Sequence, residues 1–200
     1  MYQPYSYRRE SDPAWLPPVT LEEAKRQLNI IGSQDDNLIS TYITAAARLC
    51  ENETWRSFMP SSFTMMVSQA LVKKDQLVYV SKAPVTAISN VKYYDSNETL
   101  QTMVNGTDYV YSLESEPAMV KFLTVPNVST KKIYPYQIEF TGGWEAIEDV
   151  PTDIKIAVLM AVADMYEMRN NSVVGVSLDT QLPITSKRLL APYKIGRAHV

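Results

Sequence analysis

The chain has 200 residues, of which 46% are hydrophobic and 20% are charged, and its formal net charge is −3. This balance is typical of a globular protein and excludes a uniformly basic nucleic-acid-binding protein. Cys50 is the only cysteine, which excludes a disulfide within the chain and favours synthesis in a reducing cytoplasm.

Residues 1–18 are predicted to form an extended N-terminal arm. They hold four of the chain's twelve prolines, and proline resists both helix and sheet. They also hold four aromatic side chains, which are unusual in a free tail. Two interpretations stay open, because the arm can pack on its own domain or lie on a neighbouring subunit. The residues of the second interpretation, an inter-subunit arm, are Tyr2, Tyr5, Tyr7 and Trp15.

Two helices are predicted in the next segment, 19–57. Thr20 and Glu23 have the spacing of a capping box, and Gly32 is expected to end this first helix. Asp35 and Asp36 are expected to start the second helix, where carboxylates suit the positive helix end. Its apolar residues recur at the 3.6-residue period and include Cys50, which is therefore predicted to be a buried thiol. The three alanines of 45–47 would let another helix approach closely.

The segment 58–145 is predicted to be an inserted antiparallel β-sheet domain. It contains short β-rich runs separated by turn signals, from which we expect five or six strands. A long helix is predicted within 146–172, and its apolar face from Ile154 to Tyr166 is expected to pack against the second helix. The predicted fold class is α+β: a small α-helical bundle body, an inserted antiparallel β-sheet domain, an extended N-terminal arm and a C-terminal tail.

Residues 173–200 are predicted to be a loop followed by a docking segment. From Leu182 onward the sequence has basic residues and no acidic one, and apolar residues lie among them. Such a segment can bind a partner through charge and apolar anchors. Alternatively, Leu189 and Leu190 complete the chain's own helical core. The candidate docking residues are Leu182, Lys187, Arg188, Leu189, Leu190, Pro192, Tyr193 and Lys194.

Catalytic, cofactor-binding and metal-binding residues are not expected. The only histidine is His199, no phosphate-binding or dinucleotide-binding glycine motif occurs, and no zinc spacing exists. Acidic clusters occur at Asp35–Asp36 and Glu145–Asp149, where helix capping explains them. The N-terminus lacks the apolar segment of a secretory signal, and the longest apolar run, 156–163, is too short to cross a bilayer. The sequence therefore favours a binding or assembly protein without a membrane partner.

Several segments, taken in order, resemble the tailed-phage head–tail connector proteins, which are also called adaptor or head-completion proteins. An N-terminal pair, "VTLEEAKRQLNI" and "DDNLISTYITAAARLCENETWRSF", is similar to the start of that family, and "APVTAISNVKYYD" is similar to its proline-valine strand. The later segments "FTGGWEAIEDVPTDIKIAVLMAVADMYEMR" and "LPITSKRLLAPYK" resemble its glycine turn, long helix and C-terminal ending. The resemblance covers residues 19–194, and the aromatic N-terminal arm departs from it.

The resemblance implies a virion structural protein of the neck, between capsid and tail, with no enzymatic activity and no cofactor. Family members form a ring, usually dodecameric, under the portal after genome packaging. The implied partners are other copies of the chain, the portal protein, a stopper or tail-completion protein, and packaged DNA that passes through the ring without sequence-specific contact. The docking segment would then bind the portal. Two alternatives are a small-terminase-like DNA-packaging factor, which the charge and β segment disfavour, and a β-rich binding module, which leaves the helices unexplained.

Overall fold

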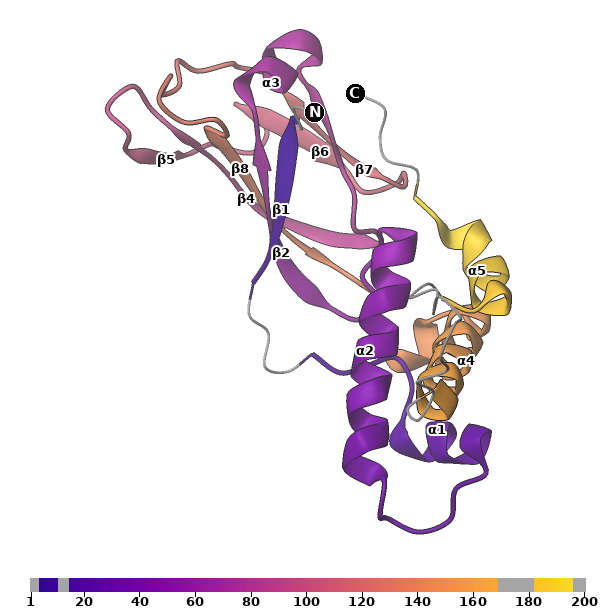
Figure 1. Cartoon of the computed structure of the whole chain (residues 1–200). Coiled ribbons are helices and arrows are strands. Elements are labelled where there is room, and N and C mark those ends of the chain that lie inside the picture. The colour runs from indigo at the N-terminus through magenta and orange to yellow at the C-terminus, as the bar shows by residue number, and fades with distance from the viewer. Residues whose placement is uncertain (1–3, 11–14, 169–181, 196–200) are drawn as a thin grey trace, which may run out of the picture. The chain divides into compact units, whose positions relative to one another are not determined.

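The computed structural model describes residues 4–10, 15–168 and 182–195. The chain divides into two compact units, one built mainly of strands and one of helices (Figure 1). The β-unit takes residues 60–144 and the N-terminal segment up to Trp15, and the helical unit takes 16–59 and 145–194. Helices and antiparallel sheets are both present, so the predicted α+β class is confirmed.

The first sheet of the β-unit has five antiparallel strands in the order β1-β2-β8-β4-β5. Its central strands β2 and β8 are paired along their whole length, and the rings of Phe63 and Phe140 stack with centroids 5.4 Å apart. Every second residue of β8 is buried, as expected for a sheet with one covered face. The strands are β1 (Tyr5–Arg9), β2 (Ser61–Val67), β4 (Val85–Tyr94), β5 (Leu100–Thr102) and β8 (Tyr136–Gly142).

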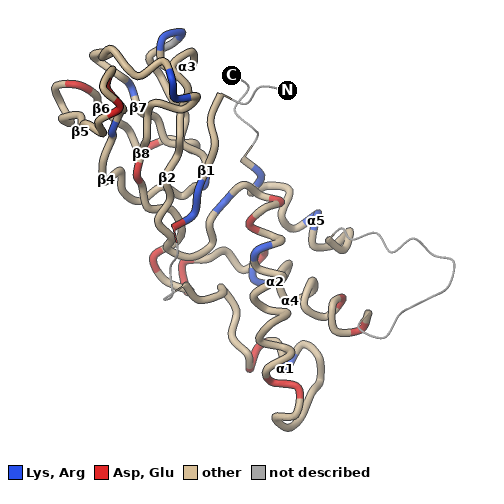
Figure 2. Tube along the Cα trace, turned by 60° about the vertical axis from the view of Figure 1, so that its left-hand side comes forward, with Lys and Arg blue, Asp and Glu red and all other residues tan. Residues whose placement is uncertain are grey.

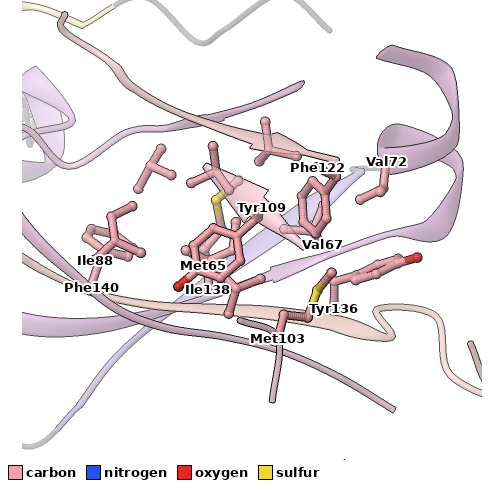
Figure 3. Close-up of a cluster of buried hydrophobic side chains, with 14 of the residues drawn as sticks. Met65, Val67, Val72, Ile88, Met103, Tyr109, Phe122, Tyr136, Ile138 and Phe140 are labelled. Atoms are coloured by element: carbon pink, nitrogen blue, oxygen red, sulfur yellow. The ribbon is translucent and has the colours of Figure 1, made fainter. Parts of the chain in front are cut away.

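The second sheet has three antiparallel strands, β3 (Leu77–Val80), β7 (Ala118–Phe122) and β6 (Tyr109–Ser112), in that order. The short helix α3 (Gln69–Asp75) leads into it. Side chains of both sheets and of α3 form one apolar cluster (Figure 3), in which the rings of Phe122 and Tyr136 meet edge to face at 5.4 Å. The prediction of five or six strands was too low, because this segment contributes seven strands to two sheets and residues 5–9 add an eighth.

The helical unit contains α1 (Leu21–Leu28), α2 (Asp36–Thr54), α4 (Thr152–Glu167), α5 (Ile184–Leu190) and two 3₁₀ turns, η1 (Ile147–Asp149) and η3 (Ala191–Tyr193). The capping box of Thr20 and Glu23 is present. The prediction that Gly32 ends α1 is wrong, because α1 ends at Leu28 and Asn29 takes the left-handed conformation with φ 54°. Asparagine is one of the few residues that tolerate this conformation, so a glycine was not required.

Helices α2 and α4 pack against each other, as predicted. Ala46 and Cys50 of α2 are fully buried, and so is Ile154 of α4. The Tyr166 hydroxyl donates to Asp35 Oδ2 at 2.5 Å, which ties the end of α4 to the start of α2. Burial raises the pKa of Cys50 to about 12, and nearby glutamates add to the shift, so this thiol is a core residue rather than a nucleophile. Among the described helices, none is long and apolar enough to span a membrane.

The N-terminal arm contributes β1, an edge strand that pairs with β2 of its own chain. Tyr5 and Tyr7 pack against the apolar cluster, and the Tyr7 hydroxyl accepts a hydrogen bond from the backbone N–H of Ser81 at 2.9 Å. Burial raises the pKa of Tyr7 to about 12. Trp15 is half-buried, and Tyr2 lies outside the described residues. The arm therefore packs on its own domain at Tyr5 and Tyr7, and its contact with a neighbouring subunit stays a prediction.

Replacing Tyr7 with phenylalanine is expected to lower the free energy of unfolding by about 1–3 kcal/mol, because the Ser81 N–H loses its acceptor in a buried site. The neighbouring Tyr5→Phe variant is the matched control, and about 0.5 kcal/mol or less is expected there. Urea unfolding followed by fluorescence measures both values. Equal losses in the two variants would contradict a specific role for the Tyr7 hydroxyl.

Candidate docking site

The docking segment, defined here as residues 182–194, consists of α5 and η3 with the residues that flank them. Its two sides differ in exposure to solvent. Leu182 and Leu190 are buried, whereas Arg188, Pro192 and Lys194 are exposed. The remaining candidates, Lys187, Leu189 and Tyr193, are half-buried. One apolar side of the segment thus completes the helical core, as the alternative interpretation expected for Leu190, and the basic side faces outward.

Four polar contacts hold the docking segment on the helical unit. The Ser186 hydroxyl donates to the carbonyl of Ala157 in α4 at 3.0 Å, and Arg56 Nε donates to the carbonyl of Tyr193 at 2.6 Å. At the far end, the Tyr193 hydroxyl reaches Asp153 at 3.4 Å and Lys194 Nζ lies 2.5 Å from Glu53 Oε1. The segment is therefore positioned by the fold and does not need a partner to order it.

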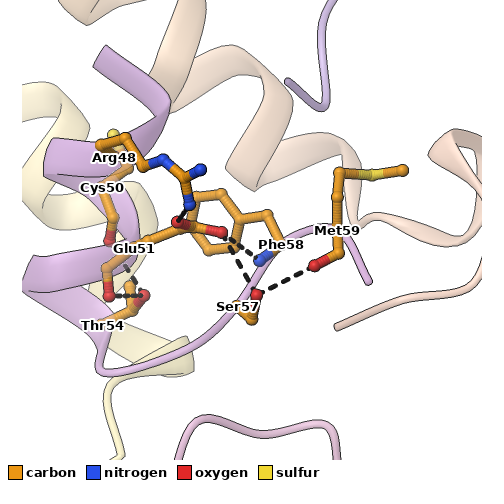
Figure 4. A network of polar contacts seen from close by, with 7 residues as sticks. All are labelled: Arg48, Cys50, Glu51, Thr54, Ser57, Phe58 and Met59. Carbon is orange, nitrogen blue, oxygen red and sulfur yellow. Dashed lines mark hydrogen bonds and ion pairs between the residues drawn. The ribbon is translucent and has the colours of Figure 1, made fainter. Parts of the chain in front are cut away.

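The position of Arg56 depends on a polar network at the end of α2 (Figure 4). The buried Glu51 carboxylate, 2% exposed, accepts a hydrogen bond from the Phe58 N–H at 2.7 Å and lies 3.4 Å from the Ser57 hydroxyl. Its second oxygen lies 3.1 Å from Arg48 Nη1. These contacts fix the turn that follows α2, and Arg56 lies within this turn.

Sequence reasoning missed Glu51 and Arg56 as positioning residues. A signal was present in the segment "DDNLISTYITAAARLCENETWRSF" quoted for the resemblance, in which Glu51, Thr54 and Arg56 follow one another. In the structure Glu51 holds the turn, the Thr54 hydroxyl donates to the Cys50 carbonyl at 2.9 Å, and Arg56 holds the docking segment. Spacing alone could not show this, because Arg56 and Tyr193 are 137 positions apart.

The exposed side of the docking segment combines basic and apolar side chains. Arg188 and Lys194 are its exposed basic residues, and Lys194 is paired with Glu53. Lys187 is half-buried, and no acidic residue occurs between Leu182 and Ile195. In Figure 2 basic positions lie on α5. Ile184 is 72% exposed and adds an apolar contact. The binding of a partner through these charges and apolar anchors stays a prediction.

A second polar region lies on the outer face of the five-stranded sheet, around a hollow of about 380 Å³. Glu139 Oε1 is 2.6 Å from Lys92 Nζ, and Glu10 accepts from Arg8 and Thr64. The hydrogen bonds from Thr64 and Arg8 lower the pKa of Glu10. Both carboxylates are thus paired anions, unlike the raised-pKa acid that general acid catalysis requires. Among the described residues, no group of three acidic, histidine or cysteine side chains could hold a metal ion.

Comparison with known proteins gives a family match over part of the chain and several solved structures of similar fold. Residues 18–112 match the family profile described as phage gp6-like head-tail connector protein. The resemblance to head–tail connectors is therefore confirmed over that part of the chain. A search of curated proteins gave no match.

Solved structures share the fold over nearly the whole chain. A protein from the neck of an empty GTA particle, computed with C6 symmetry, has a TM-score of 0.74 and 16% identity. A protein from the virion of a native gene transfer agent (GTA) particle has a TM-score of 0.73 and 16% identity. A third, from the neck of a native GTA particle computed with C12 symmetry, has a TM-score of 0.71 and 17% identity. In each pair the likeness covers 96% of this chain and 96% of the other chain.

Proposed function

We propose that the chain is a head–tail connector, or adaptor, in the neck of a tailed-phage-like virion. In this role twelve copies form a ring under the portal after genome packaging. The ring extends the DNA channel and offers a surface on which the stopper or tail-completion protein docks. The role is structural and requires neither catalysis nor a cofactor.

One observation carries the proposal: the match of residues 18–112 to head–tail connectors occurs in a chain whose whole fold is like that of neck proteins. The C12 symmetry stated for one of those necks supports a ring of twelve. Such a ring is closed by a head-to-tail interface between two different faces of the subunit. The net charge of −3 suits a channel through which DNA must slide, since a strongly basic lumen would hold the phosphates.

The docking segment is the proposed portal-binding element, with Arg188 and Pro192 exposed, Lys187 half-buried beside them and Lys194 exposed at its end. The fold positions this segment before binding, which reduces the entropy lost on association. The proposal predicts that binding weakens at high salt, because exposed charges are screened.

The double variant Lys187→Glu, Arg188→Glu tests portal docking. Its binding to purified portal is expected to weaken by at least about tenfold at low salt, because two favourable rim charges become repulsive. The control is Lys73→Glu, Lys74→Glu, which makes the same charge change on an exposed pair in α3 of the β-unit. Surface plasmon resonance measures binding, and thermal unfolding verifies that each variant is folded. Normal binding by the folded docking variant would place the portal contact elsewhere.

A further inference from the structure

Helix α4 carries two apolar stripes on opposite sides. The first packs into the helical core and consists of Ile154, Ala157, Val158, Ala161 and Val162, all buried. The second has the same i, i+3, i+4, i+7 spacing and consists of Ile156, Leu159, Met160 and Ala163. In the described chain Ile156 is 41% exposed and the other three are half-buried. Charged residues such as Lys155 and Asp164 lie on the flanks between the two stripes. An apolar helix stripe is normally covered, so the second stripe, here called the outer α4 stripe, lacks a full cover within the described residues.

The outer face of α2 is also unusual, because its exposed side chains are small and uncharged. Between Asp36 and Arg48 the helix has no charged residue, although solvent-facing helix surfaces are normally charged. Thr41 and Thr44 are exposed, and their hydroxyls donate to the carbonyls of Asn37 and Ser40 at 2.9 and 3.1 Å. Ala45 is also exposed, whereas Ala46 and Ala47 of the alanine triplet are buried. The exposed small residues Asn37, Ser40, Thr41, Thr44 and Ala45 are called the outer α2 face.

We infer that the outer α4 stripe of one subunit packs on the outer α2 face of the next subunit in the ring. This inference rests on the proposed ring and names its subunit interface. The larger side chains Ile156, Leu159 and Met160 meet small side chains, and the hydroxyls of Thr41 and Thr44 are already satisfied within their helix. Neither surface contributes a charged side chain of its own to the contact, so burying it leaves no unpaired ion.

A second copy of this chain is the partner that the geometry favours. In Figure 1 α2 and α4 lie side by side, and their core stripes are buried within the helical unit. The outer α4 stripe and the outer α2 face therefore point away from each other on opposite sides of the helix pair. Two complementary faces on opposite sides of one subunit are what a closed, head-to-tail ring requires. A stopper or tail protein would explain one uncovered face but not the matching second one.

The test uses two single variants of the full chain, Ile156→Glu on the outer α4 stripe and Ala45→Glu on the outer α2 face. Each places a charge in the inferred interface, and each is expected to weaken ring formation at least about a hundredfold. Ile31→Glu is the control, since Ile31 is a fully exposed isoleucine in the loop between α1 and α2. Native mass spectrometry and analytical ultracentrifugation measure assembly, with and without purified portal, and circular dichroism verifies folding.

Mixing the two interface variants gives a sharper readout. Each variant retains one intact face, so the outer α4 stripe of the Ala45→Glu chain can bind the outer α2 face of the Ile156→Glu chain. The expected product is a 1:1 heterodimer that grows no further, which a general loss of stability would not produce. Rings formed by either variant would overturn the inferred interface while leaving the proposed function intact. A wild-type chain that stays monomeric with and without portal would overturn the ring itself.

Discussion

The Glu51→Ala variant is expected to lose about 2–4 kcal/mol of unfolding free energy, although Glu51 lies at no proposed binding surface. The variant removes the acceptor for the buried Phe58 N–H and the partner of Arg48. A buried donor left without a partner costs about 1–3 kcal/mol, and loss of a partly buried ion pair adds to that cost. Chemical denaturation measures the loss.

Two further variants separate the roles of the Glu51 side chain. Glu51→Gln retains an oxygen acceptor for the Phe58 N–H and loses only the charge, so a smaller destabilisation is expected than in Glu51→Ala. Asn52→Ala changes an exposed residue of the same helix turn and is expected to stay within about 0.5 kcal/mol of the parent. If Glu51→Ala unfolded like Asn52→Ala, the network would contribute little to the stability of the turn.

The network also connects stability with the proposed docking to the portal. Arg56 lies between Glu51 and Phe58 in the chain, and its guanidinium holds the carbonyl of Tyr193. A turn loosened by Glu51→Ala should therefore weaken portal binding even where the protein remains folded. The position of the docking segment thus depends on Arg56, and the position of Arg56 depends on the turn at the end of α2.

Helices α1, α2 and α4 could be predicted well from the sequence, because local signals specify them, whereas α5 was not predicted as a helix. The capping box of Thr20 and Glu23 and the 3.6-residue period of α2 and α4 each depend on residues within a few turns of one another. The burial of Cys50 follows from its place in that period. The outer α4 stripe could have been found in the same way, since Ile156 and Met160 repeat the spacing of the core stripe.

The sheets could not be predicted to the same extent. A period of two indicates which side chains share a face, but it does not specify which strands pair. Strand β8 lies between β2 and β4 in the sheet, and this order depends on contacts between residues far apart in the chain. For β1, the alternation of Tyr5 and Tyr7 with polar residues was a usable strand signal, and the prolines of the arm outweighed it.

The need for glycine at the end of β8 can be explained only from the three-dimensional structure. A Cβ on Gly142 would lie 2.4 Å from the carbonyl oxygen of Lys82, so no larger residue fits there. Gly143 has φ 120° and donates its N–H to the carbonyl of Pro84 at 2.8 Å. The threonine-glycine-glycine turn noted in the resemblance is therefore required by the close approach of the segment before β4.

The Leu190→Ala variant is expected to destabilise the protein by about 2–5 kcal/mol, because Leu190 is fully buried and its removal leaves a cavity in the helical core. Ile184→Ala is the control on the same helix: Ile184 is 72% exposed, and a change of about 0.5 kcal/mol or less is expected. Thermal and urea unfolding measure both. A small loss for Leu190→Ala would mean that the docking segment contributes little to the core.

Truncation after Gln181 should then be more damaging than Leu190→Ala, because it removes Leu182 and Leu190 together with the carbonyl that Arg56 binds. Loss of portal attachment by the truncated chain would therefore not identify the docking surface, since unfolding alone would cause it. Charge reversal at Lys187 and Arg188 separates the two roles, because it leaves Leu190 in the core. If the truncated chain melted like the parent, the buried side of α5 would be dispensable and the docking segment would be an appended element.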